Sequence, residues 1–166
     1  MPKIIKGREV IEDQWVLVAE PSEELQTIED DIHIIVPLSY WTDNKTAILA
    51  RTGKAGIQVS GADELDSFSE DLDDIDVIAI DFPKFGDGRG YSMARLLRER
   101  HGYTSEIRAT GDVLRDQLSF MERCGFDAYA LRADRNMEDA IKSFSALTIA
   151  YQSDVVEPRP IYARRP

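Results

Sequence analysis

The residue types best suited to chemistry gather in one loop, residues 81–92. This loop holds three glycines at alternate positions, two carboxylates, two cations and three aromatic side chains. Glycine permits positive φ angles and a close approach of backbone amides to a ligand. The free amides at the start of a following helix attract anions. We therefore expect a small anion site in this loop, with Arg89 and Arg95 as its cationic contacts.

The same loop is also compatible with a tight structural turn in which Arg89 pairs with Asp81 or Asp87. It lacks the Gly-Lys-Ser/Thr of a phosphate-binding Walker loop, and its glycine spacing is a poor match to the dinucleotide-binding fingerprint. A contact surface for a partner protein is the third interpretation. The sequence alone leaves these three alternatives open.

Further arginines follow in the second half of the chain. Arg108 and Arg132 are expected on strands or at strand ends, where a charge needs an acidic partner or an anionic ligand. Arg115 follows Asp112 by three residues, so the two can pair on one helix face. Asp81 and Asp112 are candidate acid–base groups, although Asp112 is more simply a helix cap. The candidate ligand-binding residues are Asp81, Asp87, Gly88, Arg89, Gly90, Tyr91, Ser92, Arg95, Arg108, Arg115 and Arg132.

Other reactive residue types form no recognisable site. His33 and His101 have no Ser or Cys at triad spacing, and Cys124 is more typical of a packed thiol than of a reactive one. The chain has no array of Cys and His spaced to hold zinc, and no flavin, haem, iron–sulfur or nicotinamide motif. We expect no bound metal and no intrinsic cofactor. A single cysteine suits a reducing cytoplasm.

Five short apolar runs, centred near residues 34, 58, 79, 108 and 129, supply the elements that must position these loops. Segments with helical spacing of apolar residues follow them, for example 63–72 and 93–101. Gly102 and Gly125 are placed to end helices. The alternation predicts an α/β fold with a mainly parallel sheet of about five βα units. Because a full (β/α) barrel needs about 250 residues, we expect an open sheet that is flavodoxin-like or shaped like part of a barrel.

A single α/β domain is expected over residues 1–152. Within it, residues 1–30 add an amino-terminal strand or hairpin. Residues 153–166 contain three prolines and no apolar periodicity, and are expected to form a flexible tail. The exposed edges of such a sheet make a homo-oligomer plausible.

The charge of the chain is uneven. Its 166 residues carry a net charge of -11, yet residues 1–80 contain 18 acidic and 6 basic residues and residues 81–166 contain 13 and 14. A negative chain repels phosphate backbones, which argues against binding of nucleic acid or of an anionic membrane surface. No apolar stretch approaches the roughly 18 residues of a membrane span.

Three segments of the chain resemble the bacterial domain of unknown function 934 family: FPKFGDGRGYSMARLLRER from residue 82, RATGDVLRDQL from residue 108 and MERCGFDAY from residue 121. With Val36-Pro37-Leu38 and Trp41, the resemblance covers about residues 35–152. Members are described as oxidoreductases of sulfite reduction because they are typically encoded beside sulfite reductase. The resemblance implies a role in sulfur assimilation and transfers no catalytic residues.

Two functions are compatible with these observations, and whether the protein is an enzyme stays open. The first is an accessory protein of assimilatory sulfite reduction, whose acidic amino-terminal half docks on sulfite reductase or its electron donor. The second is a small enzyme or oxidoreductase that binds a sulfur oxyanion or a phosphorylated ligand at residues 81–95. In the second case Asp81 or Asp112 would supply acid–base chemistry.

Overall fold

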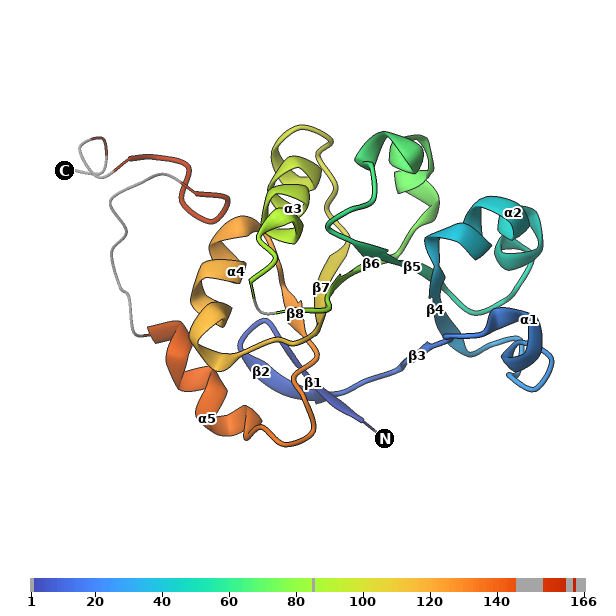
Figure 1. The fold of residues 1–166 in the computed structure, drawn as a ribbon, viewed down its shortest axis with the longest axis horizontal. Helices are drawn as coiled ribbons and strands as arrows, with labels where there is room; N and C mark the ends of the chain where they lie inside the picture. Colours follow the sequence, from blue (N-terminus) through green and yellow to red (C-terminus); the bar gives the residue numbers. More distant parts are fainter. Residues whose placement is uncertain (1, 85, 146–153, 161–162, 164–166) are drawn as a thin grey trace.

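One curled, mostly parallel sheet forms the centre of the molecule (Figure 1). The computed structural model describes residues 2–84, 86–145, 154–160 and 163. Five strands follow one another in parallel, and they are β4 (His33–Pro37), β5 (Ala55–Ser60), β6 (Val77–Phe82), β7 (Glu106–Gly111) and β8 (Ala128–Tyr129). They correspond to the five predicted apolar runs, so the prediction of an α/β fold with a mainly parallel sheet is confirmed. The sheet is curled into a half-barrel.

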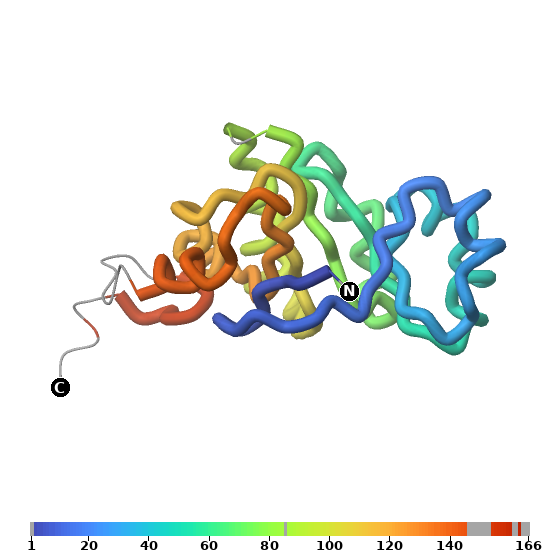
Figure 2. Tube along the Cα trace, turned by 90° about the horizontal axis from the view of Figure 1, so that it is seen from below, coloured from blue at the N-terminus to red at the C-terminus, as the bar shows by residue number. Residues whose placement is uncertain are grey.

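The amino-terminal segment adds a hairpin at one edge of the sheet and a strand at the other. Strands β1 (Lys3–Lys6) and β2 (Glu9–Glu12) form an antiparallel hairpin, and β1 pairs with β8. Strand β3 (Trp15–Leu17) pairs in parallel with β4. The complete order is β2-β1-β8-β7-β6-β5-β4-β3. The two edge strands are therefore neighbours in sequence, and Figure 2 shows the chain crossing the molecule between them.

The helices cover the outer face of the sheet (Figure 1). They are α1 (Pro21–Glu24), α2 (Leu38–Leu49), α3 (Arg89–Glu99), α4 (Leu118–Cys124) and α5 (Met137–Ile141). Alternate strand residues such as Ile78, Ile80 and Phe82 are buried in the large core beneath them. None of the described helices is long and apolar enough to cross a membrane.

The opposite, inner face of the sheet is different in character. Ile35, Val77 and Ala79 form a second, smaller apolar cluster there, with Trp15 packed against it. The side chains that strand β7 places on this face are all polar. The inner face thus combines a small apolar cluster with buried charge.

One predicted helix is wrong. Residues 63–72 form no α-helix but belong to two 3₁₀ helices, η1 (Leu65–Ser67) and η2 (Ser69–Asp74). The connection 61–76 contains eight acidic residues and no Lys or Arg, and repulsion between like charges one turn apart disfavours a regular helix. The apolar periodicity identified the buried Phe68, but it did not decide the type of helix.

The predictions for the two helix-ending glycines are confirmed. Gly102 and Gly125 follow α3 and α4 with φ angles of +63° and +114°. The helix expected near the carboxyl end consists of α5 and η4 (Lys142–Ser145), and positions 146–153 lie outside the described residues. Within the predicted tail, Asp154 is buried and accepts a 2.8 Å hydrogen bond from Arg123 Nε on α4.

Asp71 connects η2 to α2 through side-chain hydrogen bonds. Its carboxylate accepts a 2.9 Å hydrogen bond from the indole Nε1 of the fully buried Trp41 and a 2.6 Å bond from Lys45 Nζ. Lys45 also pairs with Asp74 at 2.8 Å. The hydrogen bond from Lys45 is the main reason why the pKa of Asp71 lies below its ordinary value.

We expect Asp71→Ala to lower the free energy of unfolding by about 1–3 kcal/mol, because the buried Trp41 N–H loses its acceptor. Asp73→Ala, an exposed neighbour on η2, serves as the control and should change little. Urea unfolding followed by circular dichroism measures both. Since the pKa of Asp71 is lowered in the fold, its contribution is present above its ordinary value of 3.8 and disappears as the pH falls through the lowered value. Equal losses in the two variants would contradict this role.

Candidate functional site

The glycine-rich loop forms a turn closed by its own ion pair. Helix α3 begins at Arg89, after Gly88 as its N-cap residue. The Asp87 carboxylate accepts hydrogen bonds from the backbone N of Arg89 at 3.1 Å and from its side-chain Nε and Nη2 at 3.0 and 2.8 Å. The Arg89 side chain lowers the pKa of Asp87 to about 2. This geometry matches the structural-turn interpretation with Asp87 as the partner of Arg89.

Close packing explains one of the loop glycines. A Cβ atom on Gly90 would lie 2.8 Å from the Phe82 ring and 2.9 Å from Ile80 Cγ2, so no larger residue fits there without a shift. Gly86 and Gly88 have open space instead. Tyr91 packs against Phe82 with ring centroids 5.2 Å apart, whereas Ser92 is exposed.

The candidate arginines outside the inner face form ion pairs with separate carboxylates and do not surround one pocket. Arg95 pairs with Glu99 at 3.1 Å on the surface of α3. Arg132 pairs with Asp112 and Asp134, each at 3.3 Å. Both arginine side chains are about half exposed.

Two local predictions at the start of the next helical segment are wrong. Asp112 caps no helix, because η3 (Arg115–Gln117) has Leu114 at its N-cap and α4 has Gln117. Arg115 does not pair with Asp112 but forms an ion pair with Asp139 on α5. The chain turns between β7 and α4, so the three-residue spacing does not place the two side chains on one helix face.

Asp81 lies on the inner face at the carboxyl end of β6. Its Oδ1 atom is 3.4 Å from the hydroxyl Oγ1 of Thr110 on β7. Gly111, with φ of +85°, brings the chain so close that a Cβ atom there would lie 2.7 Å from Asp81 Oδ1. Asp81 is partly buried. Asp81 and Arg108 are therefore the candidates that share the inner face.

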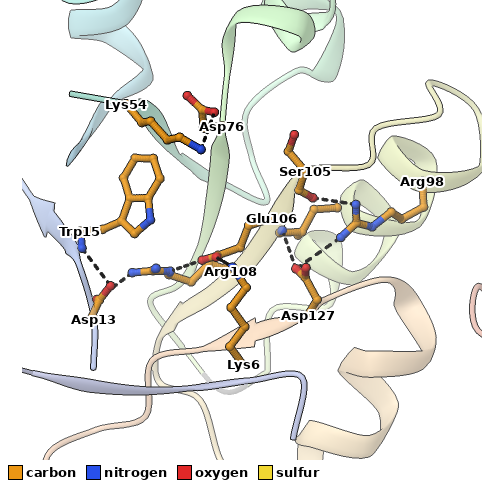
Figure 3. A network of polar contacts seen from close by, with 11 residues as sticks. Lys6, Asp13, Trp15, Lys54, Asp76, Arg98, Ser105, Glu106, Arg108 and Asp127 are labelled. Carbon is orange, nitrogen blue, oxygen red and sulfur yellow. Dashed lines mark hydrogen bonds and ion pairs between the residues drawn. The ribbon is translucent and has the colours of Figure 1, made fainter. Parts of the chain in front are cut away.

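Arg108 forms the most extensive buried polar network of the inner face (Figure 3). Its side chain is only 4% exposed. Nε donates a 2.8 Å hydrogen bond to Glu106 and Nη1 donates a 2.8 Å bond to Asp13, in the segment between β2 and β3. The expectation of an acidic partner for Arg108 is confirmed, with two carboxylates. The third nitrogen, Nη2, is buried and has no hydrogen-bond partner.

The network extends beyond Arg108 and its two carboxylates (Figure 3). Lys6 Nζ on β1 donates a 2.6 Å bond to Glu106. Asp127, which directly precedes β8 and so lies on the same side of β7 as Lys6, accepts a 2.8 Å bond from the backbone N of Ile107 and pairs with Arg98 at 3.3 Å. Burial raises the pKa of Asp127, and these contacts only partly oppose the effect. Charged groups from four separated parts of the chain thus meet around one strand.

Two cavities adjoin this network. One of about 310 Å³ is bordered by Arg108, Asp13 and the hairpin, and another of about 420 Å³ lies toward the amino ends of β4, β6 and β7. Both are lined by Lys6, Gln14, Trp15 and Glu106. The two cavities of the inner face are therefore distinct from the glycine-rich loop, where the anion site was predicted.

Sequence reasoning missed the other charged members of this network, which are Lys6, Asp13, Arg98, Glu106 and Asp127. Glu106 could have been found, because Glu106, Arg108 and Thr110 alternate with apolar residues and must share one face of a strand. Asp13 and Lys6 gave no such indication, since they lie about a hundred residues away along the chain. Among the described residues, no group of three or more His, Cys, Asp or Glu side chains is arranged to hold a metal ion.

Comparison with known proteins finds a family segment that covers only part of the site. A family model described as "Bacterial protein of unknown function (DUF934)" matches residues 56–162, which is more than half of the chain. The match includes the glycine-rich loop and Arg108 but not Lys6 or Asp13. No curated protein matches the chain.

We expect Arg108→Met to lower the free energy of unfolding by about 3–5 kcal/mol, because the buried carboxylates of Asp13 and Glu106 lose their shared cation. Adding Asp13→Asn should recover part of this loss by removing one uncompensated charge. The control, Arg95→Met, breaks an exposed pair and should leave stability nearly unchanged. Urea unfolding of the wild type, both inner-face single variants, the double variant and the control measures the coupling, and simple additivity of the two inner-face substitutions would contradict it.

Proposed function

The chain belongs to the DUF934 family of bacterial proteins of unknown function, and we propose that it is an accessory protein of assimilatory sulfite reduction. In this role it docks on sulfite reductase or on the electron donor of that enzyme. The choice of sulfite reduction as the pathway rests on the sequence resemblance to this family. The observation that carries the proposal is a concentration of exposed carboxylates in two connections of the chain.

This acidic lobe consists of the two connections 18–32 and 61–76. The first contains six acidic residues and the second eight, and neither contains Lys or Arg. The first connection, with α1, leads to β4, and the second, with η1 and η2, joins β5 to β6. The two connections therefore lie on either side of α2, which joins β4 to β5 (Figure 1). Their exposed carboxylates are Glu20, Glu23, Glu29, Asp30, Asp31, Glu64, Asp66, Glu70, Asp73 and Asp74.

The cations near this lobe neutralise it only in part. Lys45 on α2 binds Asp71 and Asp74, and Arg51 lies 3.9 Å from Asp30. Most of the exposed carboxylates therefore project a negative potential into solvent. A potential of one sign over a wide surface accelerates the encounter with a partner of opposite charge.

The state of the other charged candidates also favours docking over anion chemistry at the glycine-rich loop. Arg89, Arg95, Arg115 and Arg132 each contact a carboxylate of the chain itself. An incoming oxyanion would have to compete with these carboxylates. An accessory role requires no such competition.

The proposal predicts a salt-sensitive complex with sulfite reductase or its electron donor. The full-length tagged protein should retain the partner at about 0.1 M salt and release it at about 1 M, because the Debye length falls from about 10 Å to about 3 Å. Surface plasmon resonance with the purified partners measures association and dissociation rates. Absence of a complex with either partner at low salt would overturn the proposal.

Charge-neutralised variants test whether the acidic lobe is the docking surface. Replacing three exposed carboxylates of the acidic lobe should slow association at low salt and flatten its salt dependence; these are Glu64→Gln, Glu70→Gln and Asp73→Asn. The control carries the same change in charge outside the lobe, through Glu9→Gln, Asp116→Asn and Glu138→Gln. An equal effect of the two triple variants would show that net charge, and not the lobe, governs binding.

A further inference from the structure

The inner face of the parallel strands is more polar than such a sheet requires. Parallel strands in α/β folds are usually apolar on both faces, as they are here on the outer face. On the inner face, Gln58, Asp81, Arg108 and Thr110 stand among the side chains of β5, β6 and β7. This polarity is unlike a packed barrel interior and is typical of a surface that binds a ligand.

The 310 Å³ cavity on this face has walls of two kinds. Ile4, Ile11 and Trp15 supply apolar surface, while Lys6 and Arg108 supply cationic hydrogen-bond donors. The volume lies at the lower end of the range for small-molecule sites, about 300–1,000 Å³. An occupant with a polar end and a short apolar body would match both walls.

Arg108, which lines this cavity, has one buried donor that makes no hydrogen bond. Its Nη2 atom has less than 1 Å² of accessible surface and no hydrogen-bond partner, while Nε and Nη1 are occupied by carboxylates. A buried charged donor without an acceptor costs free energy, so an acceptor that reaches it binds favourably. The register neighbours of Arg108 on the two adjacent strands are Ala79 and Ala128, whose side chains are small and carry no hydrogen-bonding group.

The charges around the cavity restrict the kind of acceptor. Lys6 and Arg108 are balanced by Asp13 and Glu106, and the exposed Glu12 adds a further negative charge to the wall. A doubly charged oxyanion would be repelled by these carboxylates more strongly than a monoanion. A single carboxylate needs only the donors that remain unused.

We propose that this cavity binds a small monocarboxylate. Its carboxylate accepts hydrogen bonds from Arg108 Nη2 and Lys6 Nζ, and its hydrocarbon part packs against Ile4, Ile11 and Trp15. The partly exposed Trp15 lies beside the guanidinium group (Figure 3). A small movement of this indole opens Nη2 to the carboxylate and changes the surroundings of the ring.

Titration of the full chain with butyrate tests the proposal. Butyrate should bind saturably, with heat measured by calorimetry and a matching change in tryptophan fluorescence. Trp15→Phe should remove the fluorescence change but keep the calorimetric signal, because the buried Trp41 lies on the other face of the sheet in the large core. Butyramide, which has the same shape without the charge, should bind at least about tenfold more weakly.

Two variants that keep Arg108 in place test the geometry. Lys6→Met should weaken butyrate about tenfold, the loss expected for one charge-assisted hydrogen bond. Ile11→Glu adds a negative charge to the cavity wall at an exposed position and should abolish binding. Lys3→Met, a change of the same type on the same strand but outside the cavity, is the control and should bind like the wild type.

Four results would overturn the inference. They are the absence of saturable butyrate binding, equal affinity for butyramide, equal or tighter binding of sulfate, and unchanged affinity in both Lys6→Met and Ile11→Glu. An enclosed water on Nη2 as the only occupant would appear as the first of these results. The outcome is independent of the docking proposal, since none of these variants touches the acidic lobe.

Discussion

The need to neutralise one buried guanidinium group constrains the whole molecule. Arg108 stands in the middle of the sheet with almost no exposure to solvent, and a charge in such a place requires carboxylates nearby. Glu106 supplies the first from the same strand, but the second comes from Asp13, 95 residues earlier in the chain. The two-residue segment between β2 and β3 must therefore lie against the inner face, where it also lines the cavities.

Local patterns in the sequence were sufficient for the architecture. Five apolar runs predicted five parallel strands, and Gly102 and Gly125 marked two helix ends, because alternation, helical spacing and positive φ are properties of short segments. Residues 63–72 show the limit of such reasoning. Their apolar spacing is helical, but the dense acidic residues around Phe68 favour two short 3₁₀ turns, a balance that periodicity alone does not reveal.

The predicted polar contacts held only where the partners were close in sequence and no turn of the chain separated their side chains. Asp87 and Arg89 are two residues apart and pair, as one of the interpretations required. Asp112 and Arg115 are equally close, but the chain turns between them, and Arg115 binds Asp139 instead. The partners of Arg108 are set by the order of the strands in the sheet. Short sequence patterns do not reveal this order, because the two edge strands are neighbours in the sequence.

The position of β1 beside β8 has a consequence for how the protein is made. The hairpin leaves the ribosome well before its partners Ala128 and Tyr129, which are synthesised more than a hundred residues later. Strands β4 to β7 can pair with their sequence neighbours as they emerge, whereas contacts of large sequence separation form slowly. During synthesis the edge of β1 that pairs with β8 therefore stays unpaired until more than a hundred further residues have been made.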